Sequence, residues 1–203
     1  MNFLAHLYLA DDSPASMIGN LLPDLHRGRL PDDLDPVVME GVKRHRQVDA
    51  LTDAHPLFER SRDRLRPRHG RYAGVLVDVF YDHILSVQWS DYHFEPRPSF
   101  IARAYEQILS EADLMPSDMR AIMLMMAHED WIGHYATVDG IAHTLGRMSA
   151  RLRERFNRDV DLASAASDLR DQYNDFAEDF QEFFPDLMLQ IGVEPWSGRG
   201  GQA

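Results

Sequence analysis

Residues 75–87 read Val-Leu-Val-Asp-Val-Phe-Tyr-Asp-His-Ile-Leu-Ser-Val, and this stretch decides the fold class. Apolar side chains fall on nearly every side of a helix drawn through it, which is typical of a helix buried in a protein core. Asp78, Asp82 and His83 lie inside the same stretch. Burying a carboxylate without a partner costs several kcal/mol. The sequence therefore predicts a buried helix whose carboxylates bind a metal ion, form ion pairs or carry a proton.

Two pairs of metal-capable side chains occur at a spacing of four residues, namely His45 with Asp49 and Asp78 with Asp82. Such residues are about 40° apart around a helix and roughly 6 Å apart along it, so each pair could share an ion. His83 lies about 100° further round than Asp82, near enough to approach the same ion. Imidazole and carboxylate together favour Mn, Fe, Zn or Mg. A second interpretation of each pair is a solvated helix face with arginine partners.

Helical periodicity recurs along the chain and strand patterns are scarce, so the sequence predicts an all-α fold. A chain of 203 residues is long enough for one well-buried domain. We expect a single-domain helical bundle over residues 1–193 and a disordered tail over residues 194–203. The predicted helices cover residues 2–9, 13–22, 36–52, 55–66, 72–89, 98–109, 116–129, 132–136, 138–156 and 164–189.

The composition limits the possible chemistry and the cellular compartment of the protein. The chain has no Cys, which rules out disulfides, thiolate-bound metals and Cys nucleophiles and is compatible with a reducing cytoplasm. The apolar run over residues 1–10 contains His6, has no basic segment before it and stops at Asp11. It fits neither a signal peptide nor a membrane span. We expect a cytoplasmic protein that does not bind membranes.

The net charge of −12 hides a basic segment. Residues 41–71 contain nine basic and four acidic residues, whereas the rest of the chain contains 12 basic and 29 acidic residues. A basic stripe on an acidic protein can steer an anionic partner to one face. Nucleic acid is a poor candidate because no aromatic residues alternate with the arginines. The alternative is an ordinary solvated helix, with arginines paired to Glu59 and Asp63.

Several short blocks, taken together, resemble the acyl carrier protein phosphodiesterase family. The blocks are Asn2-Phe3-Leu4-Ala5-His6, Gly19-Asn20-Leu21-Leu22-Pro23-Asp24, His45-Arg46 with Asp49, Leu51-Thr52-Asp53, and Asp78 with Asp82-His83. Their order and spacing match from residue 1 to about residue 188. The family resembles divergent HD-type metal-dependent phosphohydrolases, which are all-helical and commonly hold Mn²⁺. Two features depart from these patterns, since Tyr8 stands where the family often has His, and Asp82-His83 reverses the usual His-Asp order.

The resemblance implies a metal-dependent phosphodiesterase that hydrolyses holo-acyl carrier protein to apo-acyl carrier protein and 4′-phosphopantetheine. A divalent ion, Mn²⁺ in the first place and otherwise Mg²⁺, Fe²⁺ or another, would offset the phosphate charge and lower the pKa of its water. The expected metal ligands are His45, Asp82 and His83, then Asp24, with His6 and Asp78 at or next to the ion. Asp49 is expected to orient His45 or act as the base, and Arg46 or Arg44 to contact the phosphate.

Carrier proteins are small and acidic, so the basic stripe could bind one of them. We expect Arg44, Arg60, Arg62 and Arg64 to contribute to a docking face for the carrier protein.

Two other functions remain open at this point. A hydrolase of a small phosphoester or nucleotide would use the same ligands with less need for a docking face. A non-catalytic helical binding module would hold the Asp and His pairs as buried ion pairs without metal. The sequence leaves the oligomeric state open. His128, His134 and His143 are interpreted as structural or surface residues, and the spacing of Phe176, Phe180, Phe183 and Phe184 predicts a packing stripe.

Overall fold

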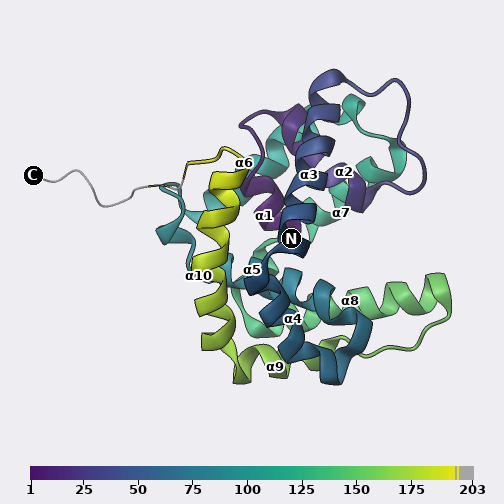
Figure 1. Cartoon of the computed structure of the whole chain (residues 1–203). Helices are drawn as coiled ribbons and strands as arrows, with labels where there is room; N and C mark the ends of the chain where they lie inside the picture. The colour runs from purple at the N-terminus through teal and green to yellow at the C-terminus, as the bar shows by residue number, and fades with distance from the viewer. Residues whose placement is uncertain (195, 197–203) are drawn as a thin grey trace, which may run out of the picture.

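The computed structural model describes residues 1–194 and 196, and every regular element within them is helical (Figure 1). The all-α prediction is confirmed. The α-helices are α1 (Phe3–Tyr8), α2 (Pro14–Leu25), α3 (Pro36–Ala54), α4 (Pro56–His69), α5 (Ala73–Val87), α6 (Arg97–Ser110), α7 (Ser117–His128), α8 (Val138–Phe156), α9 (Ala166–Asp171) and α10 (Tyr173–Gln190). Short 3₁₀ turns follow or join them: η1 (Gly70–Tyr72), η2 (Trp89–Asp91), η3 (Ala112–Leu114), η4 (Gly133–Ala136) and η5 (Ala163–Ala165).

Helix α5 lies at the centre of the packing, as the apolar stretch predicted. Its side chains Leu76, Val77, Phe80, Ile84 and Leu85 are fully buried in a core that runs continuously through the described residues. It packs against α1, α4, α8 and α10. Among the described residues, no helix combines the length and the apolar composition needed to cross a membrane.

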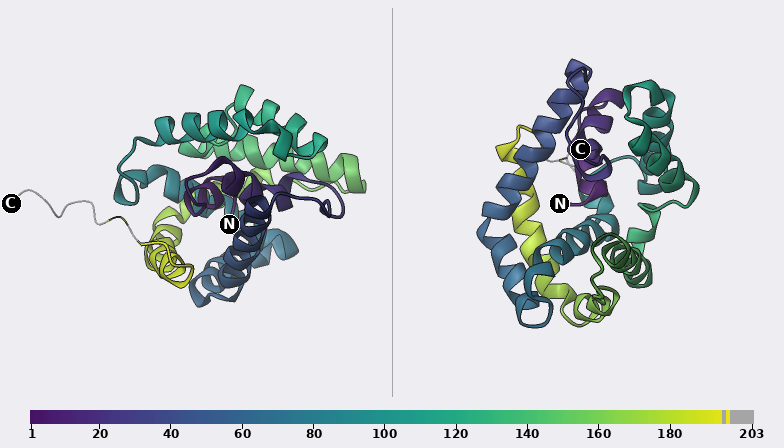
Figure 2. Two further views of the ribbon diagram at one scale, coloured as in Figure 1. Left: turned by 90° about the horizontal axis from the view of Figure 1, so that it is seen from above. Right: turned by 90° about the vertical axis from the view of Figure 1, so that its right-hand side faces the viewer.

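Helices α2 and α3 cross at a contact between backbones. A Cβ added to Gly19 would lie 2.1 Å from the carbonyl oxygen of Val38, and one added to Gly41 would lie 2.6 Å from that of Ser16. No larger residue fits either position without moving a helix. The crossing places α2, with α1 before it, between α3 on one side and α6 and α7 on the other (Figure 2). It also brings Asn20 and Asp24 of α2 to the side of α3 that carries His45.

The aromatic stripe on α10 packs inward as predicted. Phe176, Phe180, Phe183 and Phe184 are fully buried. The ring of Phe180 lies 5.2 Å from that of Tyr81 on α5, and the ring of Phe176 lies 5.3 Å from that of Phe80. These edge-to-face contacts fix α10 against α5.

The long helix expected over residues 164–189 is divided in the structure. The backbone of Gln172 leaves the helical region at φ −120° and ψ 23°, so α9 ends and α10 begins there. The break lets α9 turn toward α4, where the carboxylate of Asp168 contacts Arg68 and lies 2.7 Å from His69 Nε2. The expected disordered tail over residues 194–203 lies outside the described residues, apart from Glu194 and Trp196.

A buried carboxylate joins α10 to α4. Asp179 is fully buried and accepts hydrogen bonds from the guanidinium groups of Arg60 and Arg64 and from the Ser61 hydroxyl, the last at 2.7 Å. Burial raises the pKa of Asp179, but the hydrogen bonds from Arg60, Arg64 and Ser61 outweigh it and hold that pKa below its ordinary value. The two arginines are partly exposed, so their charges remain in contact with water.

We expect Asp179→Asn to lower the free energy of unfolding at pH 7 by about 2 kcal/mol, because both guanidinium groups lose their anion. Tm should fall by about 4–8 °C. A depressed pKa stabilises the folded state above the unfolded-state pKa of about 3.9, and this stability is lost as pH falls through the folded-state pKa. Tm measured by circular dichroism from pH 7 to pH 3 should therefore drop more steeply for the wild type than for the variant. Parallel curves would contradict this assignment.

Candidate metal centre

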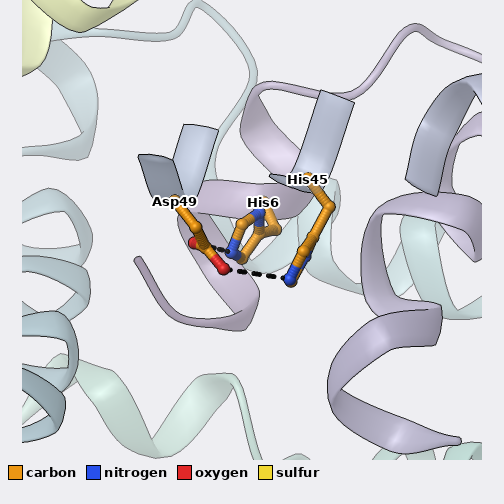
Figure 3. Close-up of side chains that lie close together, drawn as sticks. All are labelled: His6, His45 and Asp49. Carbon is orange, nitrogen blue, oxygen red and sulfur yellow. Dashed lines mark ion pairs between the residues drawn. The ribbon is translucent and has the colours of Figure 1, made fainter. Parts of the chain in front are cut away.

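Three side chains from two helices converge beside the core. They are His6 on α1 and His45 and Asp49 on α3, and one ligand atom from each lies within 4.8 Å of the others. His6 Nε2 is 3.2 Å from Asp49 Oδ1, and His45 Nε2 is 3.1 Å from Asp49 Oδ2. Figure 3 shows the carboxylate of Asp49 directed toward both imidazole rings. Two nitrogen ligands and a carboxylate within this radius are a set that a divalent ion can use.

A backbone carbonyl group of α2 fixes the orientation of His45. His45 and Asp49 are one turn apart on the same helix face, as their spacing predicted. The Nδ1 atom of His45 is 2.7 Å from the carbonyl oxygen of Asn20, to which it donates a hydrogen. With Nδ1 engaged in this way, Nε2 faces Asp49, where it can donate a hydrogen to the carboxylate or, without its proton, bind an ion. A hydrogen bond on the far nitrogen is the usual way in which a protein orients a metal-binding imidazole.

His6 is held without a hydrogen bond of its own. Its ring stacks on that of His45, with 4.0 Å between the centroids. Both ring nitrogens are buried and neither has a hydrogen-bond partner among the described residues. Burial lowers the pKa of His6 to about 4, so the imidazole is neutral at pH 7. A buried neutral imidazole with an unused lone pair, 3.2 Å from a carboxylate, fits a metal ligand.

A cleft of about 280 Å³ lies next to these three residues. It is lined by the further carboxylates of Asp24, Asp53 and Asp78. Asp24 Oδ1 lies 3.9 Å from His45 Nε2. Desolvation raises the pKa of both Asp24 and Asp78, and the charge of Asp49 adds to the effect. The α-amino group of Met1 lies 2.9 Å from Asp78 Oδ1 and 3.4 Å from Asp49 Oδ1. The cleft therefore concentrates negative charge and attracts positive groups.

The structure does not bring Asp82 to this set. Its buried carboxylate accepts backbone N–H groups from the first turn of α1, from Leu4 at 2.7 Å and from Asn2 and Ala5 at 3.3 Å. Burial raises the pKa of Asp82 to about 7, and the three amides act against that rise. A carboxylate at this position satisfies amides that a helix leaves unpaired and complements the positive end of its dipole. Asp82 thus positions the helix that carries His6.

His83 points elsewhere as well. Its Nδ1 atom is 2.7 Å from the carbonyl oxygen of Tyr135 in η4, and its ring lies 5.9 Å from that of Tyr173 on α10. Adjacent residues on a helix diverge by about 100°, and here this angle separates Asp82 and His83 into different environments. Of the six expected metal ligands, Asp24 and Asp78 line the cleft and His6 and His45 lie beside it, whereas Asp82 and His83 are neither lining residues nor part of the three-residue set.

None of the expected substrate-binding arginines lines the cleft. Arg60 and Arg64 pair with Asp179, and Arg62 pairs with Glu59. Arg44 donates to the carbonyl oxygens of Leu9 and Ile191 and lies 3.4 Å from Asp11. Arg46 is exposed on α3. The docking face stays a prediction. The guanidinium groups of Arg60, Arg62 and Arg64 on α4 are paired with carboxylates of the same chain.

The sequence reasoning missed an arginine that does line the cleft. Arg151 on α8 shares it with Asp24, Asp49 and Asp78. The sequence could have indicated it, because Arg147, Arg151 and Arg155 are four residues apart and so lie on one face of a helix.

Comparison with known proteins identifies the family of the chain. The family model for acyl carrier protein phosphodiesterase matches residues 1–187. The acyl carrier protein phosphodiesterase of Serratia proteamaculans is 34% identical over 193 residues, which cover 94% of this chain and 97% of the relative. Those of Yersinia enterocolitica and Escherichia coli K12 are each 34% identical over 191 residues, covering 94% of this chain and 97% of the relative. No solved structure matches the chain. The chain belongs to the acyl carrier protein phosphodiesterase family.

Proposed function

We propose that this protein hydrolyses holo-acyl carrier protein to apo-acyl carrier protein and 4′-phosphopantetheine with the help of a divalent metal ion. The family supplies the substrate, and its name makes the chain a phosphoric diester hydrolase. The observation that carries the metal is the convergence of His6, His45 and Asp49 within 4.8 Å at the edge of a carboxylate-lined cleft. We also place the reaction in the cytoplasm, as the cysteine-free sequence predicted.

The proposed ligands are His6, His45 and Asp49, with Asp24 as the nearest further carboxylate. His6 supplies a neutral nitrogen. Burial lowers the pKa of His45, but the hydrogen bond to Asp49 and the charge of Asp24 outweigh it and hold that pKa above its ordinary value, so an ion would take the place of a proton on Nε2. Asp49 supplies the negative charge between the two imidazoles. Burial raises the pKa of Asp49, but the imidazoles of His45 and His6 outweigh it and hold that pKa well below its ordinary value, so the carboxylate is ionised at pH 7. When bound, the ion offsets negative charge on the phosphodiester and makes water a better nucleophile. Water attacks phosphorus and loses a proton, the bond from phosphorus to the oxygen of the carrier-protein serine breaks, and that oxygen takes up a proton to leave as the serine hydroxyl.

The protein residues do the positioning in this reaction. Asp49 touches both imidazoles and is proposed as a ligand rather than as the general base. Asp24 and Asp78 stand on the cleft wall, where desolvation raises the pKa of both carboxyl groups, and we propose them as the groups that take up the proton of the attacking water. The donor set of two imidazoles and a carboxylate suits Fe²⁺ and Mn²⁺, and Mn²⁺ is our first candidate. Mg²⁺ prefers oxygen ligands and would depend on the further carboxylates of the cleft.

Intact-mass analysis of holo-acyl carrier protein tests this function. The substrate is incubated with purified protein and Mn²⁺, Mg²⁺ or Fe²⁺, and in parallel with protein treated with EDTA. We expect the phosphopantetheine mass to be lost only when metal is present. Loss that persists in EDTA would overturn the metal requirement. Turnover of nucleotides alone would indicate a hydrolase of small phosphoesters, and no turnover with any metal would indicate a binding module.

A further inference from the structure

Two hollows meet along one side of α8. The first is the cleft of about 280 Å³ beside the candidate metal centre, and the second is a groove of about 450 Å³ between α2, α7 and α8. Asp24 and Arg151 line both, so the groove opens from the cleft. Its basic residues are Arg27, Arg147, Arg151 and Arg155, and its apolar wall includes Ile122, Met125 and Trp131. The groove therefore joins a positively charged surface to the carboxylate-rich cleft.

The charges of this arginine groove (Arg27, Arg147, Arg151 and Arg155) are mostly uncompensated. Arg147 pairs with Glu129 and its guanidinium lies 3.9 Å from the centroid of the Trp131 ring. Within the described part of the chain, Arg27, Arg151 and Arg155 form no ion pair with a carboxylate. Glu154 and Asp24 are the acidic residues that line the groove. By contrast, Arg60, Arg62, Arg64, Arg66 and Arg68 on α4 all pair with carboxylates.

Arg151 is partly buried among like charges. Partial burial lowers its pKa, and the like charges of Arg147 and Arg27 lower it further. An anion bound at Arg151 would relieve this repulsion, and a guanidinium can contact two oxygens of one phosphate at once. Its place on the cleft wall, beside the carboxylates Asp24, Asp49 and Asp78, suits a group that must approach the metal centre while carrying negative charge.

We propose that Arg151 binds the phosphodiester of the substrate and that Arg27 and Arg155 in the adjoining groove bind an acidic surface of the protein that carries it. This inference rests on the proposed function and specifies where its substrate lies. The proposed anion-binding surface therefore lies on α8, and not on α4 as the sequence predicted. The partner is identified by charge complementarity, since a groove of three unpaired arginines stands out on a protein of net charge −12. The apolar wall of Ile122, Met125 and Trp131 gives the same partner an apolar contact.

Steady-state hydrolysis of holo-acyl carrier protein by matched variants tests the phosphate contact. Arg151→Ala should lower kcat/KM about 100-fold, because a charge-assisted hydrogen bond to the phosphate is lost, and Arg151→Lys should recover part of the loss. Arg153→Ala is the control, because Arg153 lies on the same helix, pairs with Asp159 and lines neither hollow. It should stay within about twofold of the wild type. Titration with Mn²⁺ should give the same affinity for Arg151→Ala as for the wild type.

The groove is tested by the double variant Arg27→Ala/Arg155→Ala. It should raise KM about tenfold while kcat is unchanged, and KM should depend less on salt than in the wild type. Equal losses in Arg151→Ala and Arg153→Ala, or no loss in Arg151→Ala, would overturn the phosphate contact. An unchanged KM in the double variant would overturn the groove. Absence of hydrolysis in the wild type would instead refute the proposed function itself, so the two failures are distinguishable.

Discussion

Asp49→Asn is expected to reduce hydrolysis of holo-acyl carrier protein at least about 1,000-fold, because a metal ligand that stabilises phosphate charge contributes several kcal/mol to the reaction. Among the described residues, Asp49 is the carboxylate that contacts both imidazoles, at 3.2 Å from His6 Nε2 and 3.1 Å from His45 Nε2. The amide has the shape of the carboxylate but not its charge, so the fold should be kept. Isothermal titration with Mn²⁺ should show weakened binding in parallel with the loss of turnover.

Asp53→Asn is the matched control for this prediction. Asp53 lies one turn further along α3 and lines the same cleft, but it is not part of the three-residue set. Its substitution should leave both turnover and Mn²⁺ affinity within about threefold of the wild type. If Asp49→Asn keeps Mn²⁺ affinity while turnover falls, Asp49 acts on the reaction without holding the ion. If both variants behave like the wild type, the metal centre is misplaced.

The second large effect is expected for Asp82→Asn. We expect it to lower the free energy of unfolding by about 3 kcal/mol, since one of the two acceptor oxygens becomes an NH2 donor that faces buried N–H groups of α1. Tm should fall by about 6–12 °C. The first turn of α1 should also lose its orientation, and with it His6, so that Mn²⁺ affinity falls about 10- to 100-fold, as for other groups that orient a metal ligand.

Ser86→Ala provides the control on the same helix. The hydroxyl of Ser86 is buried and has no hydrogen-bond partner among the described residues, so its removal should change the stability by less than about 0.5 kcal/mol. Thermal unfolding followed by circular dichroism and Mn²⁺ titration should be run on both variants. An Asp82→Asn protein with wild-type Tm but no metal affinity would show that Asp82 binds the ion directly.

The fold could be predicted from the sequence because its evidence is local. Periodicity over residues 75–87 is enough to identify a buried helix, and the spacing of Phe176, Phe180, Phe183 and Phe184 is enough to identify the face of α10 that packs inward. The break at Gln172 was missed because it depends on a contact with α4, where Arg68 and His69 meet Asp168 about 100 residues away in the chain. No local pattern records that contact.

The candidate site was predictable in part for the same reason. His45 and Asp49 share a helix turn, and their partnership follows from spacing alone. Asp82 could face either a metal ion or the amides of α1, depending on how α1 packs. The sequence of α5 alone does not determine that packing. Likewise, a count of charges finds the arginines of α4 but not the distant Asp179 and Asp168 that neutralise them. The unpaired Arg151 is identified only when every partner can be seen.

The dependence of α1 on Asp82 also bears on the order in which the protein folds. Helix α1 has six residues and receives no capping hydrogen bond from the side chain of Asn2. Isolated helices of that length do not persist in water. The acceptor for its first amides comes from a residue 77–80 positions later in the chain, and closing so long a loop has an entropic cost that must be met before the contact forms. During synthesis His6 leaves the ribosome well before α5, yet it reaches its place in the site only after α5 has been made and buried.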